Sequence, residues 1–233
     1  MFAAPFLPRI SSRSSIVILA LAAMCVAACR HGDQTGPTPA GSMSFLVTSA
    51  KSATGNLGGL RAADNLCQNL ANAAGGGRKT WRAYLSVERD ADNGNRPTNA
   101  RSRIGNGPWF NAKGVMVAGN VNELHARTGD SMVFIDERGQ LINGQWPGSP
   151  TPNEHDIMTG SASDGTLLAG FTCGDWTSDS TTTRGQVGHS DGMGPNGNTA
   201  GALSSWNSAH SNQSCANTAP GGGAGRIYCF ALN

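Results

Sequence analysis

The chain has 233 residues with 17 Lys and Arg against 15 Asp and Glu, and only 14% of its residues are charged. Two basic residues, Arg9 and Arg13, belong to a predicted signal peptide, so the mature chain carries 15 basic and 15 acidic residues. A chain without net charge has no long-range field that attracts polyanions, which disfavours nucleic acid as a partner. The 32 glycines predict a fold rich in loops and turns.

Residues 1–28 predict an export signal. Arg9 and Arg13 precede an apolar run at residues 16–23, which is too short to remain in a bilayer as a helix. The run is followed by Val26-Ala27-Ala28-Cys29, which resembles the lipobox of bacterial lipoproteins. We therefore expect cleavage before Cys29 and a lipid such as palmitate on this residue, with an ordinary cleaved signal and a free Cys29 as the alternative. By resemblance to sorted lipoproteins, Arg30 favours the outer membrane of a bacterial cell envelope.

Residues 29–42 are rich in Gly, Pro and Thr and predict a flexible tether, which leaves residues 43–233 as one domain. A first strand is expected at residues 44–49, followed by an amphipathic helix from Gly58 that carries Cys67 on its apolar face. Three glycines, residues 75–77, end this helix before a strand at residues 81–86. The arginine-containing segment at residues 88–107 is expected to be a solvated loop, or alternatively a patch for anionic glycans.

The second half of the chain predicts short elements separated by turns. Strands are expected at residues 115–118 and 132–136, with one helical turn at residues 121–125 between them. Residues 145–156 predict an irregular excursion, and residues 170–176 a strand or loop that places Cys173 beside Trp176. The last expected element is a buried strand at residues 226–232 with Cys229 at its centre.

The cysteines predict an oxidising compartment. When Cys25 leaves with the signal and Cys29 carries lipid, four remain, and an even number in an exported chain indicates two disulfides. The remaining residues are Cys67, Cys173, Cys215 and Cys229. Four cysteines allow three connectivities, between which spacing alone does not choose.

Three stretches together resemble a known family. They are GGLRAADNLCQNLANAAGGGRKTWRAYLS at residues 58–86, TCGDWTSD at residues 172–179 and SCANTAPGGGAGRIYCF at residues 214–230. They are similar to the endostatin domain of certain collagens and to bacterial lipoproteins with an endostatin-like domain of unknown function. The resemblance implies an α+β, C-type-lectin-like fold with a loop-rich mixed sheet and one main N-terminal helix. It also implies two nested disulfides, Cys67 with Cys229 and Cys173 with Cys215.

The metal sites of such proteins are not expected here. Endostatin binds zinc through histidines at the start of its domain, whereas the corresponding region of this chain has only His31. Calcium-dependent lectins use EPN-type and WND-type motifs, to which residues 152–154 (PNE) and 206–208 (WNS) correspond poorly. We therefore expect no metal and no cofactor.

Candidate ligand-binding residues are polar side chains in the second half of the chain, namely Asn153, Glu154, His155, Asp156, His189 and Asp191. With His210, the two other histidines are expected to lie in loops that converge on one face, or simply to bond to nearby backbone. None has the HxxxH or HExxH spacing of a helical zinc site. No catalytic residue is predicted, because there is no nucleophile elbow, P-loop or dinucleotide-binding motif.

These observations predict a non-enzymatic, membrane-anchored lipoprotein whose lectin-like domain binds a glycan or an extracellular protein. One alternative is a metal-dependent module or enzyme that uses the loops of His155, Asp156, His189 and Asp191. Another is a structural envelope lipoprotein without a soluble ligand. Four tryptophans are expected to serve mainly as core anchors, with one or two available to stack on a sugar: Trp109, Trp146, Trp176 and Trp206.

Overall fold

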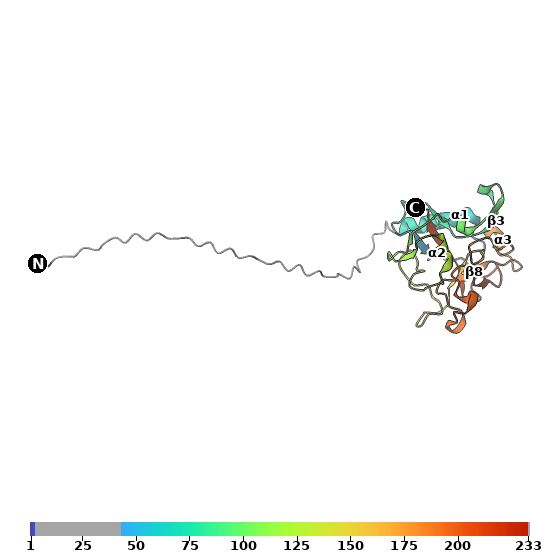
Figure 1. Ribbon diagram of the computed structural model, residues 1–233. Helices are drawn as coiled ribbons and strands as arrows, with labels where there is room; N and C mark the ends of the chain where they lie inside the picture. Colours follow the sequence, from blue (N-terminus) through green and yellow to red (C-terminus); the bar gives the residue numbers. More distant parts are fainter. Residues whose placement is uncertain (3–42, 233) are drawn as a thin grey trace. The chain divides into compact units, whose positions relative to one another are not determined.

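The computed structural model describes residues 1–2 and 43–232 (Figure 1). The predicted cleavage site, the lipidated Cys29 and the tether lie outside the described residues. The chain divides into two units, Met1–Gly36 and Pro37–Asn233, and all the described helices and strands belong to the second. Within the described part, none of the helices combines the length and apolar content needed to cross a membrane.

The domain is a mixed α+β structure with few helices and short strands. Its helices are α1 (Gly59–Ala73), α2 (Val121–Ala126) and α3 (Cys173–Trp176). Four 3₁₀ turns occur at Ala91–Asn93, Ala100–Ser102, Pro195–Gly197 and Gly201–Ser204. The strands are β1 (Phe45–Val47), β2 (Trp81–Ala83), β3 (Val87–Asp90), β4 (Arg96–Thr98), β5 (Trp109–Phe110), β6 (Met116–Ala118), β7 (Asp156–Met158), β8 (Gln186–His189), β9 (His210–Ser211) and β10 (Gly223–Ala231).

The last strand, β10, organises the main sheet. This sheet has the order β1-β10-β7-β8-β9, and β2 also pairs with β10. The pairing of β10 is antiparallel to β1 and β2 but parallel to β7. Residues near the start and the end of the domain therefore lie side by side in one sheet, with β1 at its edge. β3–β4 and β5–β6 form two separate two-stranded sheets.

Alternation along β1 and β10 gives the sheet two buried faces. Leu46 and Cys229 face one apolar cluster, to which α1 contributes Ala63, Cys67 and Ala71. On the opposite face, an aromatic cluster consists of Phe45, Tyr84, Trp109, Phe134, Trp206, Tyr228 and Phe230. Trp109, Trp176 and Trp206 are fully buried, which confirms their expected role as core anchors, and only Trp146 of the four is partly exposed.

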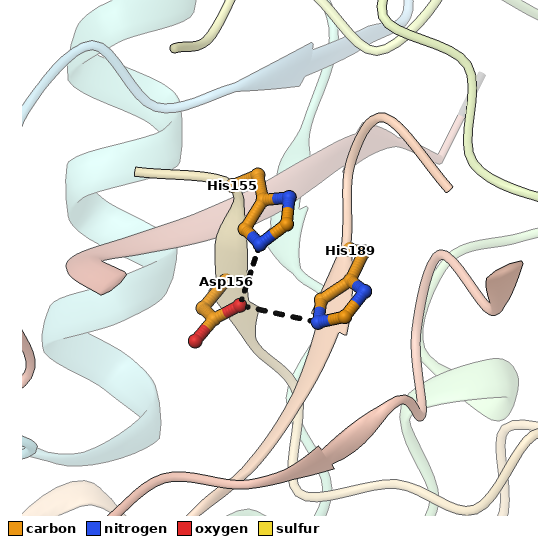
Figure 2. A group of neighbouring side chains, drawn as sticks. All are labelled: His155, Asp156 and His189. Carbon is orange, nitrogen blue, oxygen red and sulfur yellow. Dashed lines mark ion pairs between the residues drawn. The ribbon is translucent and has the colours of Figure 1, made fainter. Parts of the chain in front are cut away.

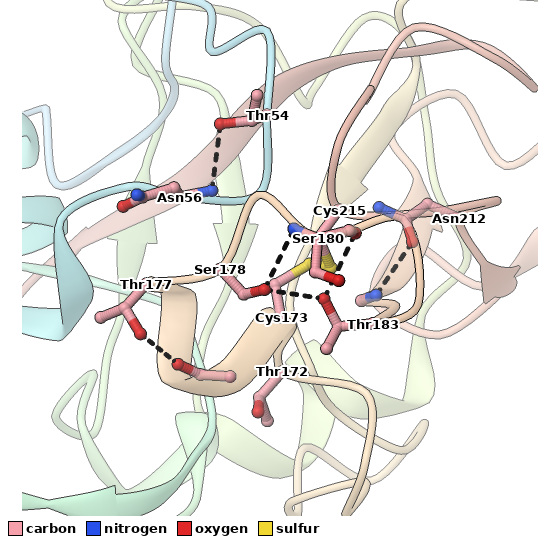
Figure 3. The surroundings of a disulfide bond; sticks show 12 residues. Thr54, Asn56, Thr172, Cys173, Thr177, Ser178, Ser180, Thr183, Asn212 and Cys215 are labelled. Atoms are coloured by element: carbon pink, nitrogen blue, oxygen red, sulfur yellow. Dashed lines mark hydrogen bonds between the residues drawn. A yellow bond between two sulfur atoms is a disulfide. The ribbon is translucent and has the colours of Figure 1, made fainter.

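Both disulfides have the nested pairing that the resemblance implied. Cys67 in α1 is bonded to Cys229 in β10, across 162 residues of sequence. The inner bridge joins Cys173 to Cys215, 42 residues apart, in a region that is rich in Ser and Thr side chains (Figure 3). The expected helix, its glycine-rich end and the strands at both ends of the domain are likewise present.

Two expected elements are wrong. Residues 132–136 form no strand, because Asp130 O accepts hydrogen bonds from the backbone N–H groups of Val133 and Phe134 and closes a turn there. Residues 173–176 form a left-handed turn, α3, with φ between 48° and 64°. This turn directs the Asp175 carboxylate to the backbone N–H groups of Glu88 and Arg89, at 2.6 and 3.2 Å.

The arginine-containing segment is also more ordered than a solvated loop. It contains the β3–β4 hairpin, and the Arg103 side chain is only 9% exposed, with its guanidinium bonded to both Asp64 oxygens at 3.0 and 2.8 Å. Sequence periodicity missed this pair because Asp64 lies beside Ala63 on the buried side of α1. Arg103 is thus committed to the structure and does not contribute to a patch for anionic glycans.

Candidate metal centre

Three neighbouring strands bring an aspartate and two histidines onto one face of the sheet. Asp156 at the start of β7 lies directly opposite His189 at the end of β8. In the next pair, His210 of β9 lies opposite Val187, two residues before His189. Because side chains two residues apart on a strand point to the same face, Asp156, His189 and His210 share one face. His189 and His210 lie in strands and not in loops as expected, whereas His155 lies in the loop before β7.

His155 completes the cluster from the residue before β7. Its ring stacks on that of His189, with centroids 4.3 Å apart and planes 10° from parallel. The His155 and His189 rings both direct Nε2 toward Asp156 (Figure 2). Asp156 Oδ1 lies 3.3 Å from His155 Nε2, 3.4 Å from His189 Nε2 and 3.6 Å from His210 Nε2. We call these four residues the His-Asp cluster.

The opposite nitrogen of each ring has a hydrogen-bond acceptor. Nδ1 of His155 lies 2.8 Å from Asp191 Oδ1, Nδ1 of His189 lies 2.8 Å from Leu203 O, and Nδ1 of His210 lies 3.0 Å from Ser211 O. An acceptor at Nδ1 places the proton of a neutral imidazole there and leaves a lone pair on Nε2. When the rings are neutral, all three therefore turn an Nε2 lone pair toward one carboxylate oxygen, an arrangement suited to a cation.

Two atoms of the cluster are buried without any hydrogen-bond partner. These are Asp156 Oδ1 and His189 Nε2, and both residues are at least 98% buried. Burying an ionised oxygen without a partner is costly, so its burial indicates a group that compensates for it. The distances fit a metal ion. Ligand atoms about 2.0–2.1 Å from a tetrahedral ion lie about 3.3–3.4 Å apart, close to the three Asp156 distances. The possible ligand atoms of His155, Asp156 and His189 all lie within 4.8 Å of one another.

Local electrostatics distinguish the members of the cluster. Burial, together with the neighbouring His155, lowers the pKa of His189 and keeps its ring neutral. The adjacent Asp156 carboxylate raises the pKa of the half-exposed His210. Burial opposes ionisation of Asp191, but its contacts with His155 and the Gln145 N–H outweigh burial and lower its pKa. Asp191 is thus an ionised acceptor behind His155.

The cluster opens into a cavity of about 390 Å³. His155, His189 and His210 line one part of it, and the rest is formed mainly by amide, proline and leucine side chains. Gly222, next to the lining residue Gly221, packs against two wall residues and has φ of +119°. A Cβ there would lie 2.4 Å from Asn153 Nδ2 and 3.2 Å from His155 Cδ2, so a side chain would displace the wall of the cavity.

The six candidate residues have different roles in the structure. His155, Asp156 and His189 form the cluster, Asp191 supports it from behind, and Asn153 lines the cavity. Glu154 faces elsewhere and is bonded to Lys51 and to Arg226, whose Nε lies 3.2 Å from Glu154 Oε2. It is a buried structural carboxylate and not part of the cluster.

Sequence reasoning left His210 out of the candidate set and assigned no role to Asn212. The sequence signal for these two residues is that His210 and Asn212 alternate around Ser211, as side chains on one face of a strand do. This signal does not identify a site unless the pairing of β8 with β9 is known. Asn207 of the WNS segment is buried and donates to Tyr84 Oη and to two backbone carbonyls, so it has a structural role.

Comparison with known proteins gives a family for most of the domain. Residues 50–193 match the family described as protein of unknown function (DUF1554). The chain belongs to this family. The region shared with DUF1554 contains His155, Asp156, His189 and Asp191, whereas His210 and the cysteines at 215 and 229 follow it. Comparison with curated proteins found no match.

Proposed function

We propose that this DUF1554 protein is a metal-binding module that holds a divalent transition-metal ion, with zinc as the best fit. His155 Nε2, His189 Nε2 and Asp156 Oδ1 are the three protein ligands, and the half-exposed His210 lies beside them on the open side of the ion. The observation that carries this proposal is the unpartnered Asp156 Oδ1, which three imidazole nitrogens surround at 3.3 to 3.6 Å. This function corresponds to the metal-dependent alternative considered from the sequence.

The donor set supports zinc over calcium. Imidazole nitrogens combined with one carboxylate are typical zinc ligands, whereas calcium takes six to eight oxygens. The hydrogen bond from His155 to Asp191 supplies the outer carboxylate that commonly orients a metal-bound histidine. The cavity beside His210 leaves room for an additional, exogenous ligand, as expected of a binding module.

The sequence adds a cellular location and a fold to this proposal. The lipobox-like segment supports a lipoprotein held in the cell envelope through Cys29, with the domain carried by the tether. The nested disulfides and the single long helix support an endostatin-like, C-type-lectin-like fold. We propose binding and not catalysis as its activity, with a partner outside the membrane.

Zinc titration of the full-length protein tests the metal site. After removal of metals with a chelator, isothermal titration calorimetry should give one zinc ion per chain, and elemental analysis should give the same ratio. His189→Ala and Asp156→Asn should each weaken zinc binding about 100-fold or more, because each removes one buried donor. His210→Ala should have a smaller effect, since that ring is half-exposed.

His125→Gln provides a matched control. His125 is a partly buried histidine outside the cluster, with its ring bonded to Tyr84 Oη and Val121 O. This substitution should leave the zinc affinity unchanged, and circular dichroism should verify that each variant is folded. Zinc binding that survives in folded His189→Ala, or that disappears equally in His125→Gln, would rule out the His-Asp cluster as the metal site.

A further inference from the structure

An unpartnered hydrogen-bond donor lies in the wall of the same cavity. Asn212 is 95% buried, and its Nδ2 has no hydrogen-bond partner. The orientation of the amide is fixed because Asn212 Oδ1 accepts a hydrogen bond from the Gly185 N–H at 2.9 Å, as Figure 3 shows beside the inner disulfide. The nitrogen is therefore the free end, and it needs an acceptor oxygen.

Asn212 is held in a defined position relative to the cluster. It follows β9 at two residues from His210, and this spacing along an extended chain covers about 7 Å. His210 and Asn212 both line the cavity, together with His155 and His189. The residue that carries the buried amide donor thus lines the same cavity as the three histidines of the cluster.

The charge of the cavity favours an anionic ligand. A divalent ion with one ligating carboxylate and neutral imidazoles keeps one positive charge, and the Asp191 carboxylate that partly offsets it lies behind His155, where His155 and the Gln145 and Met193 N–H groups bond to it. Among the described residues that line the cavity, none is a lysine, arginine, aspartate or glutamate. The walls that these residues form therefore present no acidic side chain that would repel an anionic ligand.

We propose that the cavity binds a small carboxylic acid with a second acceptor oxygen, such as a dicarboxylate or hydroxycarboxylate. This inference rests on the proposed metal site. One carboxylate oxygen coordinates the ion on the side of the half-exposed His210, and the second oxygen-bearing group accepts the hydrogen bond from Asn212 Nδ2. The amide selects for the second group, since a ligand without it leaves a buried donor unpaired.

The test uses the full-length protein loaded with cobalt(II), which serves as a visible probe for a zinc site. Acetate, malonate, succinate and an uncharged methyl glycoside are titrated while the cobalt absorption spectrum is recorded. Malonate or succinate should change the spectrum and bind at least about tenfold more tightly than acetate, and the glycoside should not bind. Equal affinities for acetate and both dicarboxylates, or preferential binding of the glycoside, would overturn the proposal.

Asn212→Asp isolates the role of the amide. The new side chain retains an oxygen for the Gly185 N–H but replaces the free donor by an acceptor, so dicarboxylate affinity should fall about tenfold or more while cobalt still binds. Asn217→Asp is the matched control, because it makes the same substitution at an exposed residue outside the cavity and should change the affinity less than threefold. Unchanged dicarboxylate binding in Asn212→Asp would contradict the assignment. Failure of cobalt to bind the wild-type protein would instead refute the metal site itself.

Discussion

At the scale of single residues, Asp156 differs from the other buried carboxylates of the domain. Asp64 is paired with Arg82 and Arg103, and Glu154 with Lys51 and Arg226. Asp136 has no such cation but accepts hydrogen bonds from two backbone N–H groups. Asp156 Oδ1 has three imidazole nitrogens nearby and no hydrogen bond. This contrast is the physical basis for assigning an ion to Asp156 and not to the others.

The same comparison predicts the behaviour of Asp136. Burial raises the pKa of this carboxyl, against the opposing influence of the Gln140 and Arg138 N–H groups. A raised folded-state pKa means that ionised Asp136 destabilises the fold at neutral pH, and that the penalty disappears as pH falls below the folded-state pKa. Asp136→Asn keeps the acceptor oxygen for both N–H groups, so it should raise Tm at pH 7 by at most about 3 °C, equivalent to about 1 kcal/mol.

Thermal unfolding at pH 7 and at pH 3 measures this effect. The difference between the wild type and Asp136→Asn should shrink at pH 3, where the wild-type carboxyl is protonated. If Asp136→Asn is less stable than the wild type at pH 7, the ionised carboxylate stabilises the fold, and the prediction is wrong.

At the scale of secondary structure, the metal centre depends on the close packing of β8 against the backbone of residues 206–207, just before β9. A Cβ on Gly188 would lie 2.0 Å from Trp206 O and 2.3 Å from Asn207 N. Both contacts are with backbone, which cannot move aside as a side chain would. Gly188 therefore permits the packing that places His189 beside His210.

Gly188→Ala should destabilise the domain by about 1–3 kcal/mol, the usual range for overpacking. Zinc affinity should fall as well, because the strand must shift at the residue that precedes His189. Urea unfolding and zinc titration measure the two effects. Gly94→Ala is a control in an exposed turn with no atom within 4 Å of the added Cβ, and it should reduce stability without reducing zinc affinity.

The sequence predicted the elements that depend on the spacing of nearby residues. The α1 helix and β10 appear in the apolar spacing around Cys67 and Cys229, and the paired histidine and aspartate segments were recognised as candidate ligands. The pairing of β7, β8 and β9 is non-local, so nothing in the sequence placed His210 beside Asp156. The left-handed turn at residues 173–176 was missed for a related reason, since its support comes from Glu88 and Ser86 far away in the sequence.

At the scale of the whole molecule, the two disulfides close loops of very different length. In the chain-entropy model, the bond between Cys67 and Cys229 stabilises the fold by about 5 kcal/mol and that between Cys173 and Cys215 by about 4 kcal/mol. Both are large relative to the net stability of an ordinary domain. We expect the double substitution Cys67→Ala with Cys229→Ala to be the more destabilising.

Guanidinium chloride unfolding of both double variants measures the difference. The inner-bridge variant, Cys173→Ala with Cys215→Ala, serves as the comparison, because all four cysteines are fully buried and lose similar packing. If the outer-bridge variant proves as stable as the wild type, tethering of α1 to β10 is not a source of stability.

The position of β10 also constrains how the protein is made. A chain emerges from its N-terminus, yet β1, β2 and β7 all pair with a strand that is synthesised near the end. Until residues 223–231 emerge, the strands that precede β10 lack their central partner, and Cys67 meets the thiol of Cys173 long before that of Cys229. Non-native bonding between Cys67 and Cys173 is the competing reaction, so a disulfide isomerase should raise the yield of correctly bonded protein.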